Sequence, residues 1–306
     1  MSYNMKKMDW DNWKNLKSIA NYNQRKIIFH PLYNKKKFVK EIYKSQMNKD
    51  LDLSNLKTFS EKLNGFKLDK SINKMARLLA DKNKVRDYVK EKVGKKYLIP
   101  HYFAKRKITV DDLKELPNSF VLKTNNGSGS NYIVTNKKEE DLQEVCNYLN
   151  YISTIKYGYI WGEFFYNKIK PCIVAEKLLV DKEGNIPDDL KCFCFKDNDG
   201  IRRKILYFER VVGDERYRIM FDEDWKILDY GSSFGKLDID LKRPKNYKEI
   251  LNIIDKLSED FSFIRVDLFL FKDKIYFGEL TFIPTAGYLK FDDDKIDNLW
   301  GSYIAD

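Results

Sequence analysis

The sequence has little of several residue types, and each scarcity excludes a class of protein. Only two histidines and four cysteines occur in 306 residues, and no C-x-x-C pair is present. Neither a zinc site nor a disulfide framework is therefore indicated. Cys192 and Cys194 lie two apart in an apparent strand, and we expect them to be buried reduced thiols. No apolar run approaches the roughly 18 residues of a membrane-spanning helix, and the G-x-x-x-x-G-K-[ST] phosphate loop is missing.

Positive charge is what the chain has in excess. It carries 57 basic and 46 acidic residues, a net charge of +11, which favours an anionic partner such as a nucleotide, a glycan or a membrane surface. Lysine is interleaved with Asn, Ile and Tyr nearly everywhere, and no compact basic tract predicts nucleic-acid binding. Peripheral membrane association stays open, and no pattern predicts the oligomeric state. The polar N-terminus lacks a secretory signal, so we expect a cytoplasmic protein.

Hydrophobic periodicity divides the chain into three parts. Residues 1–97 read as a lysine-rich helical region, residues 98–177 alternate strand and helix, and residues 178–306 are mostly β. Strands and helices without strict alternation predict an α+β fold. Expected helices are 11–20, 36–47, a helix starting near 72, 81–93, 139–152 and 247–260; expected strands are 119–123, 131–135, 170–176, 190–195, 201–209, 216–221, 264–271 and 275–282.

Two acidic residues near the C-terminus stand out because they would meet on neighbouring strands. Residues 263–271 and 274–282 are apolar and alternating, with two or three residues between them, as in a β-hairpin. A three-residue turn places Asp267 opposite Glu279 and Arg265 opposite Thr281, whereas a two-residue turn would break this pairing. Opposed like charges destabilise a sheet unless a hard cation such as Mg²⁺ lies between them. A solvent-facing acidic pair is the alternative.

A lysine followed by a Gly/Ser loop between two expected strands is a second candidate site. Lys123 ends one strand and runs into Gly127-Ser128-Gly129-Ser130. The backbone N–H groups of such a loop can bind oxyanions, and glycine allows a close approach. The alternative is a plain hairpin turn, because Gly and Ser are ordinary turn residues.

Charged residues also stand at the ends of other expected elements. Asp81-Lys82 opens a helix that bears Arg86, Glu176 ends a strand, and Lys191 starts another. Each alone is explained by solvation or an ion pair. Together, in this order, they resemble the ATP-grasp superfamily and, in detail, its TupA-like branch of polysaccharide and teichuronopeptide biosynthesis. The resemblance covers about residues 56–300 and is carried by 56–62, 79–89, 120–130, 189–195 and 265–282.

The resemblance implies an ATP-grasp fold, in which an N-terminal helical region precedes two α+β subdomains that grip ATP. These would be a lid subdomain at 98–177 and a metal-binding core subdomain at 178–306. It implies that ATP and Mg²⁺ are the cofactors. By position, the residues that match ATP contacts are Lys82, Lys123, Gly127, Ser128, Gly129, Ser130, Glu176, Lys177, Leu179 and Lys191. The metal ligands would be Asp267 and Glu279. Many relatives have Asn where this chain has Thr281, whose hydroxyl could hold a metal-bound water, so the number of metal ions stays open.

The activity that the resemblance implies is an ADP-forming carboxylate–amine ligase that works through an acyl phosphate. The substrates would be a carboxylate, such as a uronic-acid sugar, and an amine or amino acid in capsule or surface-polysaccharide biosynthesis. Arg265, Arg210 and Arg218 are candidates for holding the substrate carboxylate, since a guanidinium can bind it bidentately. The alternatives are an ATP-grasp kinase that phosphorylates a sugar or glycan precursor, and a non-catalytic module that binds anions or a membrane surface.

Overall fold

The chain folds into two units in a computed structural model, which describes residues 8–180, 184, 187–212, 215–228 and 241–305, with side chains except at 209–218. Unit 1 comprises Met1–Val39, Lys70–Tyr88 and Ile99–Ile186; unit 2 comprises Lys40–Asp69, Val89–Leu98 and Pro187–Asp306. The expected helical region 1–97 is therefore shared between the two units. Among the described residues, no helix has the length and apolar character needed to cross a membrane.

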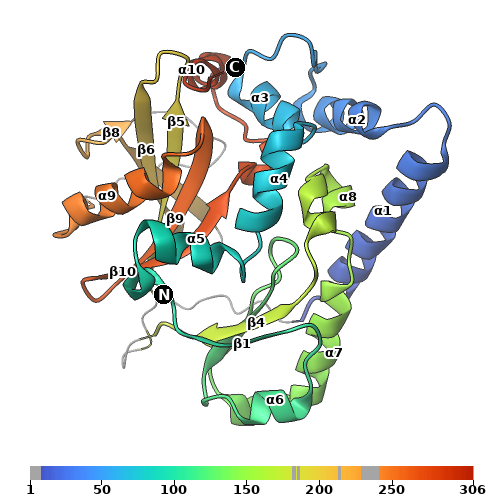
Figure 1. Ribbon diagram of the computed structural model, residues 1–306, viewed down its shortest axis with the longest axis vertical. Coiled ribbons are helices and arrows are strands. Elements are labelled where there is room, and N and C mark those ends of the chain that lie inside the picture. Colours follow the sequence, from blue (N-terminus) through green and yellow to red (C-terminus); the bar gives the residue numbers. More distant parts are fainter. Residues whose placement is uncertain (1–7, 181–183, 185–186, 213–214, 229–240, 306) are drawn as a thin grey trace. The chain divides into compact units, whose positions relative to one another are not determined.

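Unit 1 is built on a four-stranded antiparallel sheet in the order β1-β4-β2-β3, of which β1 and β4 are labelled in Figure 1. The strands are β1 (His101–Lys105), β2 (Phe120–Thr124), β3 (Tyr132–Val134) and β4 (Ile173–Lys177). The helices are α1 (Trp10–Phe29), α4 (Lys70–Leu79), α6 (Val110–Lys114), α7 (Leu142–Ser153) and α8 (Gly158–Trp161), with 3-10 turns η2 (Lys137–Glu139) and η3 (Phe164–Lys168). Alternate β2 residues Phe120 and Leu122 are buried in one apolar core with Val145 and Leu149 of α7.

Unit 2 holds a six-stranded antiparallel sheet in its described part, in the order β10-β9-β5-β6-β7-β8. The strands are β5 (Asp188–Lys196), β6 (Arg202–Val212), β7 (Glu215–Phe221), β8 (Ile227–Leu228), β9 (Phe263–Phe271) and β10 (Lys274–Thr281). The helices are α3 (Phe59–Phe66), α9 (Tyr247–Ser258) and α10 (Asp294–Ser302), with 3-10 turns η1 (Lys95–Tyr97) and η4 (Pro284–Gly287). Helices α2 (Lys35–Met47) and α5 (Val85–Lys92) have residues in both units.

One face of the unit 2 sheet carries an aromatic cluster directly beside charged residues. Phe193 of β5 and Phe263 of β9 pack around Phe59 of α3, with ring centroids 6.1 Å and 5.1 Å away, and Trp300 of α10 closes the cluster 5.3 Å from Phe59. Because residues two apart share a face, Lys191 and Arg265 continue this surface. The charged side chains of Lys191 and Arg265 therefore belong to a well-packed sheet.

The expected strands are all present, with ends that differ by up to three residues, and the fold is α+β as predicted. Two helices differ more. The first extends to Phe29, beyond the expected end at Ala20. The fifth begins only at Val85, so Asp81 and Lys82 lie in the turn before it. Cys192 and Cys194 are buried thiols, as expected.

Candidate functional site

The Gly/Ser loop of unit 1 is tied down at its base. The hydroxyls of Thr124 and Ser130 share a 2.6 Å hydrogen bond across the loop. Asn125 extends the β2–β4 pairing by one residue, since its backbone N–H donates to Cys172 O (3.0 Å) and its Oδ1 accepts from the Cys172 N–H (2.7 Å). The Nδ2 of Asn125 also donates to Asp81 Oδ1 at 2.9 Å. The tip of the loop, 127–129, lies beyond these bonds.

Local geometry favours both glycines of the loop tip. Gly129 has φ +78°, a left-handed conformation that other residues rarely adopt. A Cβ at Gly127 would lie 3.0 Å from the ring of Tyr157. Glycine at these two positions therefore suits the backbone path of the loop tip.

Lys82 and Lys123 both lie at this loop. Lys82 belongs to the turn in which Asp81 Oδ1 accepts from the N–H groups of Asn83 (3.0 Å) and Lys84 (3.3 Å). Its Nζ donates to the carbonyl oxygen of Gly127 at 2.6 Å. Lys123, on β2, forms an ion pair with Glu176 on β4. The expectation of a helix at Lys82 was wrong, because the Asp81 side chain forms a turn instead.

Glu176 is surrounded by more basic groups than the sequence suggested. It is paired in the sheet with Val121 on one side and with His101 on the other. Burial, and next the charge of Arg86, lower the pKa of His101, which favours the neutral imidazole. The His101 Nε2 is buried without a hydrogen-bond partner among the described residues. His101 was missed because sequence alone does not reveal which strand lies beside β4.

The end of β4 completes the segment that the sequence assigned to ATP. Lys177 is exposed, and its backbone N–H donates to Pro100 O at 2.9 Å. Leu179 is buried. Of the ATP-contact residues predicted in this unit, the structure thus brings Lys82 to the loop and Lys123 to Glu176.

A pocket of about 530 Å³ opens beside the loop, within unit 1. Its walls come from α1, from the loop and from aromatic side chains: Met8, Asp9, Asn12, Trp13, Leu16, Ser128, Gly129, Ser130, Asn131, Tyr132, Tyr148, Tyr157 and Trp161. The first helix, for which sequence reasoning gave no role, therefore forms part of the surroundings of the loop.

In unit 2, the register of the β9–β10 hairpin places Glu279 directly opposite Asp267, as predicted. The sequence left the turn at two or three residues, and only a three-residue turn was expected to give this pairing. The turn has two residues, Lys272 and Asp273, both with left-handed φ (49° and 59°), and Phe271 pairs with Lys274 rather than Ile275.

A β-bulge at Gly278 restores the pairing that the two-residue turn would break. The register shifts between Phe277 and Glu279, so one extra residue returns Glu279 to the face of Asp267. A Cβ at Gly278 would lie 3.0 Å from the Asp267 carbonyl oxygen. Glycine at this position therefore permits the close approach of the two strands.

The cation between the two carboxylates is the guanidinium of Arg265. Its Nε and Nη2 donate to the two oxygens of Asp267, each at 2.6 Å. The Nη2 also donates to Glu279 Oε1 and to Thr281 Oγ1, both at 3.0 Å, and Thr281 Oγ1 donates to Glu279 Oε1 at 2.9 Å. Arg265 is thus engaged with the acidic pair, and the positive charge that the pairing required is supplied by the chain itself.

Lys191 adds a second cation to this row. It lies opposite Asp267 in the β5–β9 register and forms an ion pair with Asp189. Burial alone would lower the pKa of the Lys191 ammonium, but the carboxylates of Asp267 and Asp189 outweigh burial and raise it. Lys191 therefore remains protonated.

The oxygen donors of this row fit a magnesium ion that is bound together with phosphate. Asp267 has only 6% of its side chain exposed, whereas Glu279 has 45% exposed and faces solvent. Burial raises the pKa of Asp267 to about 6, against the opposing effect of Arg265. No three His, Cys, Asp or Glu side chains among the described residues gather as a metal cage. Mg²⁺ in proteins is usually held by one or two carboxylates plus phosphate and water, and this row offers two carboxylates.

Arg210 and Arg218 are placed by backbone only. Arg210 lies on β6 opposite Tyr217, and Arg218 lies on β7 opposite Glu209. Their side chains lie outside the described part of the structure, so their predicted contact with a substrate carboxylate stays a prediction.

Comparison with known proteins gives one family match. A family model described as TupA-like ATPgrasp matches residues 61–305. No curated protein matches the chain. Among solved structures, the chain is similar to D-alanine–D-alanine ligase from Helicobacter pylori (16% identity, 74% of this chain and 61% of that chain covered, TM-score 0.39) and to L-amino acid ligase from Bacillus licheniformis (17% identity, 71% and 43% covered, TM-score 0.40). The chain thus spans less than two thirds of the length of either protein.

Proposed function

Because the chain belongs to the TupA-like ATP-grasp family, we propose that it is an ADP-forming ligase that uses ATP and Mg²⁺ to join a carboxylate to an amine. The observation that carries the proposal is the bulged register that sets Glu279 opposite Asp267 on one sheet face, beside Lys191. Two carboxylates held together on one sheet face, with one open to solvent, would provide oxygen ligands for a phosphate-bound Mg²⁺.

The residues of unit 1 would bind the nucleotide. Lys123 and the backbone of the loop 127–130 would meet the phosphates, and Lys82 would fix the loop through its bond to Gly127 O. Glu176, Lys177 and Leu179 would hold the adenine, and Lys191 of unit 2 would bind near the phosphates or ribose. Asp267 and Glu279, assisted by Thr281, would hold Mg²⁺, which offsets the charge of the transferring phosphoryl group.

The reaction would begin when an oxygen of the substrate carboxylate attacks the γ-phosphorus and ADP leaves. The amine then attacks the acyl carbon, and phosphate departs with the oxygen that the carboxylate gave. Positive charge near the transferring group matters more here than acid–base catalysis, and Arg265, Lys191 and Lys123 are suited to supply it. Since Arg265 already binds both acidic residues, we assign the substrate carboxylate to Arg210 and Arg218 as the remaining candidates.

We further propose that the carboxylate belongs to a uronic-acid sugar of a surface polysaccharide such as a capsule, and that the amine is an amino compound or amino acid. A cytoplasmic enzyme would have both ATP and such sugar precursors at hand. This assignment is supported by the family membership alone, and screening uronic-acid sugars against amines for ADP release would identify the pair.

Oxygen-18 in the substrate carboxylate tests the acyl-phosphate route. When the enzyme converts a labelled carboxylate and an amine, mass spectrometry should find one labelled oxygen in each released inorganic phosphate, because the carboxylate oxygen leaves with the phosphate. The nucleotide product should be ADP. Unlabelled phosphate would rule out this route. A stable phosphorylated product without amine-dependent phosphate would indicate a kinase, and the absence of any substrate-dependent turnover would indicate a binding module.

Replacing Lys123 by methionine should weaken binding of ATP and of inorganic tripolyphosphate by about tenfold or more, since a charged hydrogen bond to phosphate is lost. Glu176→Gln is the matched control, because it breaks the same Lys123–Glu176 ion pair but keeps the lysine. That variant should weaken ATP binding while tripolyphosphate binding is retained. Calorimetry measures both ligands. Wild-type affinity of Lys123→Met for tripolyphosphate would show that Lys123 is not a phosphate ligand.

A further inference from the structure

A basic segment without acidic residues covers positions 12–40, which comprise most of α1, the turn that follows it and the start of α2. Between Asp11 and Glu41 the sequence has no Asp or Glu, whereas eight Lys or Arg residues occur there. Over the whole chain the ratio is 57 basic to 46 acidic residues, so the compositional lysine bias alone does not account for this stretch. The segment thus concentrates most of the net charge of +11 in about a tenth of the chain.

Large apolar side chains are exposed in the same segment. Among the described residues, the ten exposed large hydrophobic side chains include five between Ile19 and Leu32. Leu32 and Phe29 are the two most exposed, at 78% and 77%, and Ile28 is 53% exposed. We call Ile28, Phe29 and Leu32 the apolar tip. Single exposed apolar residues are ordinary, but a cluster at one turn marks an interaction site.

The apolar tip is held firmly by the rest of unit 1. Helix α1 is anchored by the buried side chains of Trp13 and Ala20, and Asn23 Nδ2 donates to Tyr159 O at 2.9 Å. After α1 ends at Phe29, Pro31 cannot continue the helix, and the chain turns toward α2, whose residues follow in blue in Figure 1. Tyr33 is buried directly after the tip. The exposed side chains of the tip are therefore bracketed by anchored residues on both sides.

Basic side chains flank the tip on both sides in the sequence. Arg25 precedes it on the last turns of α1, and Lys36 and Lys37 follow it in the first turn of α2, all three exposed. Hydrophobic side chains bordered by lysine and arginine match the boundary of a bilayer, where acyl chains lie beneath anionic headgroups. A nucleic acid or an acidic protein surface would satisfy the charges but would leave Phe29 and Leu32 in water.

We propose that the apolar tip docks on an anionic phospholipid membrane. Ile28, Phe29 and Leu32 enter the headgroup–acyl boundary, and Arg25, Lys36 and Lys37 meet the lipid phosphates. The docking is peripheral and reversible, because three side chains and a few charges provide much less binding than a spanning helix. The interaction does not depend on the proposed ligase activity, since none of these residues is assigned to ATP, Mg²⁺ or substrate.

Co-sedimentation of the full chain with vesicles tests the proposal. Vesicles of phosphatidylcholine alone are compared with an equal mixture of phosphatidylcholine and phosphatidylglycerol. The wild-type chain should bind the mixed vesicles, and added salt should weaken this binding. Lys36→Glu with Lys37→Glu should weaken it by at least about tenfold, and Phe29→Ser with Leu32→Ser should weaken it to a comparable degree. Because all four side chains are exposed, these variants should unfold at the wild-type temperature.

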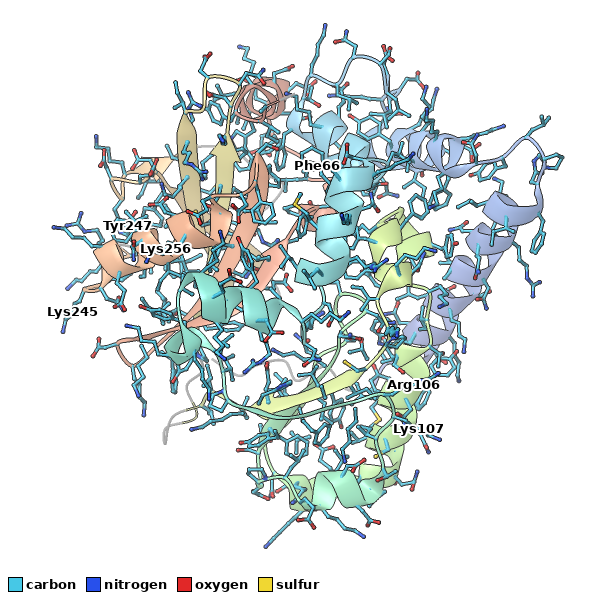
Figure 2. All side chains as sticks on the ribbon, in the orientation of Figure 1. Phe66, Arg106, Lys107, Lys245, Tyr247 and Lys256 are labelled. Atoms are coloured by element: carbon cyan, nitrogen blue, oxygen red, sulfur yellow. The ribbon has the colours of Figure 1, made fainter. Side chains whose placement is uncertain are left out.

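Two matched controls distinguish binding by the apolar tip from nonspecific adsorption to vesicles. Ile227→Ser removes an exposed side chain (68%) elsewhere, and Arg106→Glu with Lys107→Glu reverses two exposed charges of unit 1 that are labelled in Figure 2. Both controls should bind the mixed vesicles as the wild type does. The proposal is overturned if the controls lose binding as the tip variants do, if phosphatidylcholine alone binds equally well, or if a DNA duplex binds more tightly than the mixed vesicles.

Discussion

Replacing Glu279 by glutamine is expected to lower substrate-dependent ATP turnover by at least about a hundredfold while the protein stays folded. The amide keeps the size of the side chain and can still accept from Arg265 and Thr281, which now bond to Glu279 Oε1. It removes the negative charge that would hold Mg²⁺ on the phosphates. Nearly half of the side chain is exposed, so the loss of charge should cost little stability.

Glu279 is a better test of the metal site than Asp267. Asp267 is buried and binds Arg265 through both oxygens, so Asp267→Asn would disturb the sheet as well as the metal. Asp273→Asn is the control on the same hairpin, because Asp273 is an exposed turn residue whose left-handed φ asparagine tolerates. ADP release and thermal unfolding would be measured for all three. Turnover by Glu279→Gln near the level of Asp273→Asn would refute the assignment of Glu279 to the metal.

The hairpin shows both the reach and the limit of sequence reasoning. Alternating apolar residues were enough to predict two strands, and a three-residue turn between them would place Asp267 opposite Glu279, the pairing that the structure has. The structure has the two-residue turn, which was expected to break this pairing, and the bulge at Gly278 compensates for it. A bulge depends on how closely two strands approach, which the alternation of residues does not encode. The glycine itself was the available signal, because glycine inside a strand often marks a bulge.

Other parts of the site depend on neighbours that are distant in sequence. His101 and Glu176 lie 75 positions apart and meet only because β1 pairs with β4. The pocket beside the loop joins Trp13 to Ser128 and Trp161, so its first wall comes from a helix outside the matched residues 61–305. Local patterns predict elements well, but the order of strands in a sheet is set by global packing, and such pairs cannot be read from spacing.

Arg265 illustrates a different limit, because its residue type predicts a carboxylate partner without indicating which carboxylate. The sequence placed it on the face of Asp267 and suggested a substrate carboxylate as its ligand. In the structure its ligands are carboxylates of the chain, Asp267 and Glu279. A guanidinium that lies two residues from an aspartate on the same strand forms an ion pair with that aspartate, because both groups are buried and an unpaired buried charge is costly.

Replacing Arg265 by leucine should therefore destabilise the protein by about 3–5 kcal/mol, the usual cost of leaving one partner of a buried ion pair. Asp267 would stay buried with 6% of its side chain exposed and would lose two hydrogen bonds of 2.6 Å. Asp267→Leu should cost less, because Arg265 keeps Glu279 and Thr281 as acceptors. Chemical denaturation of both single variants measures the free energy of unfolding.

The double variant decides whether the pair itself or the packing of this position is responsible. When both charges are replaced by leucine, no charge of the pair is left uncompensated, and such replacements are often close to neutral. The double variant should therefore be more stable than Arg265→Leu alone. Lys44→Gln breaks an exposed ion pair with Asp50 (2.8 Å) and should change the free energy of unfolding by less than about 1 kcal/mol. If the stability losses of the two single variants simply add up in the double variant, Arg265 stabilises the sheet through packing and not through its charge. Asp267 would then need no cation from the chain itself in the absence of Mg²⁺ and ATP.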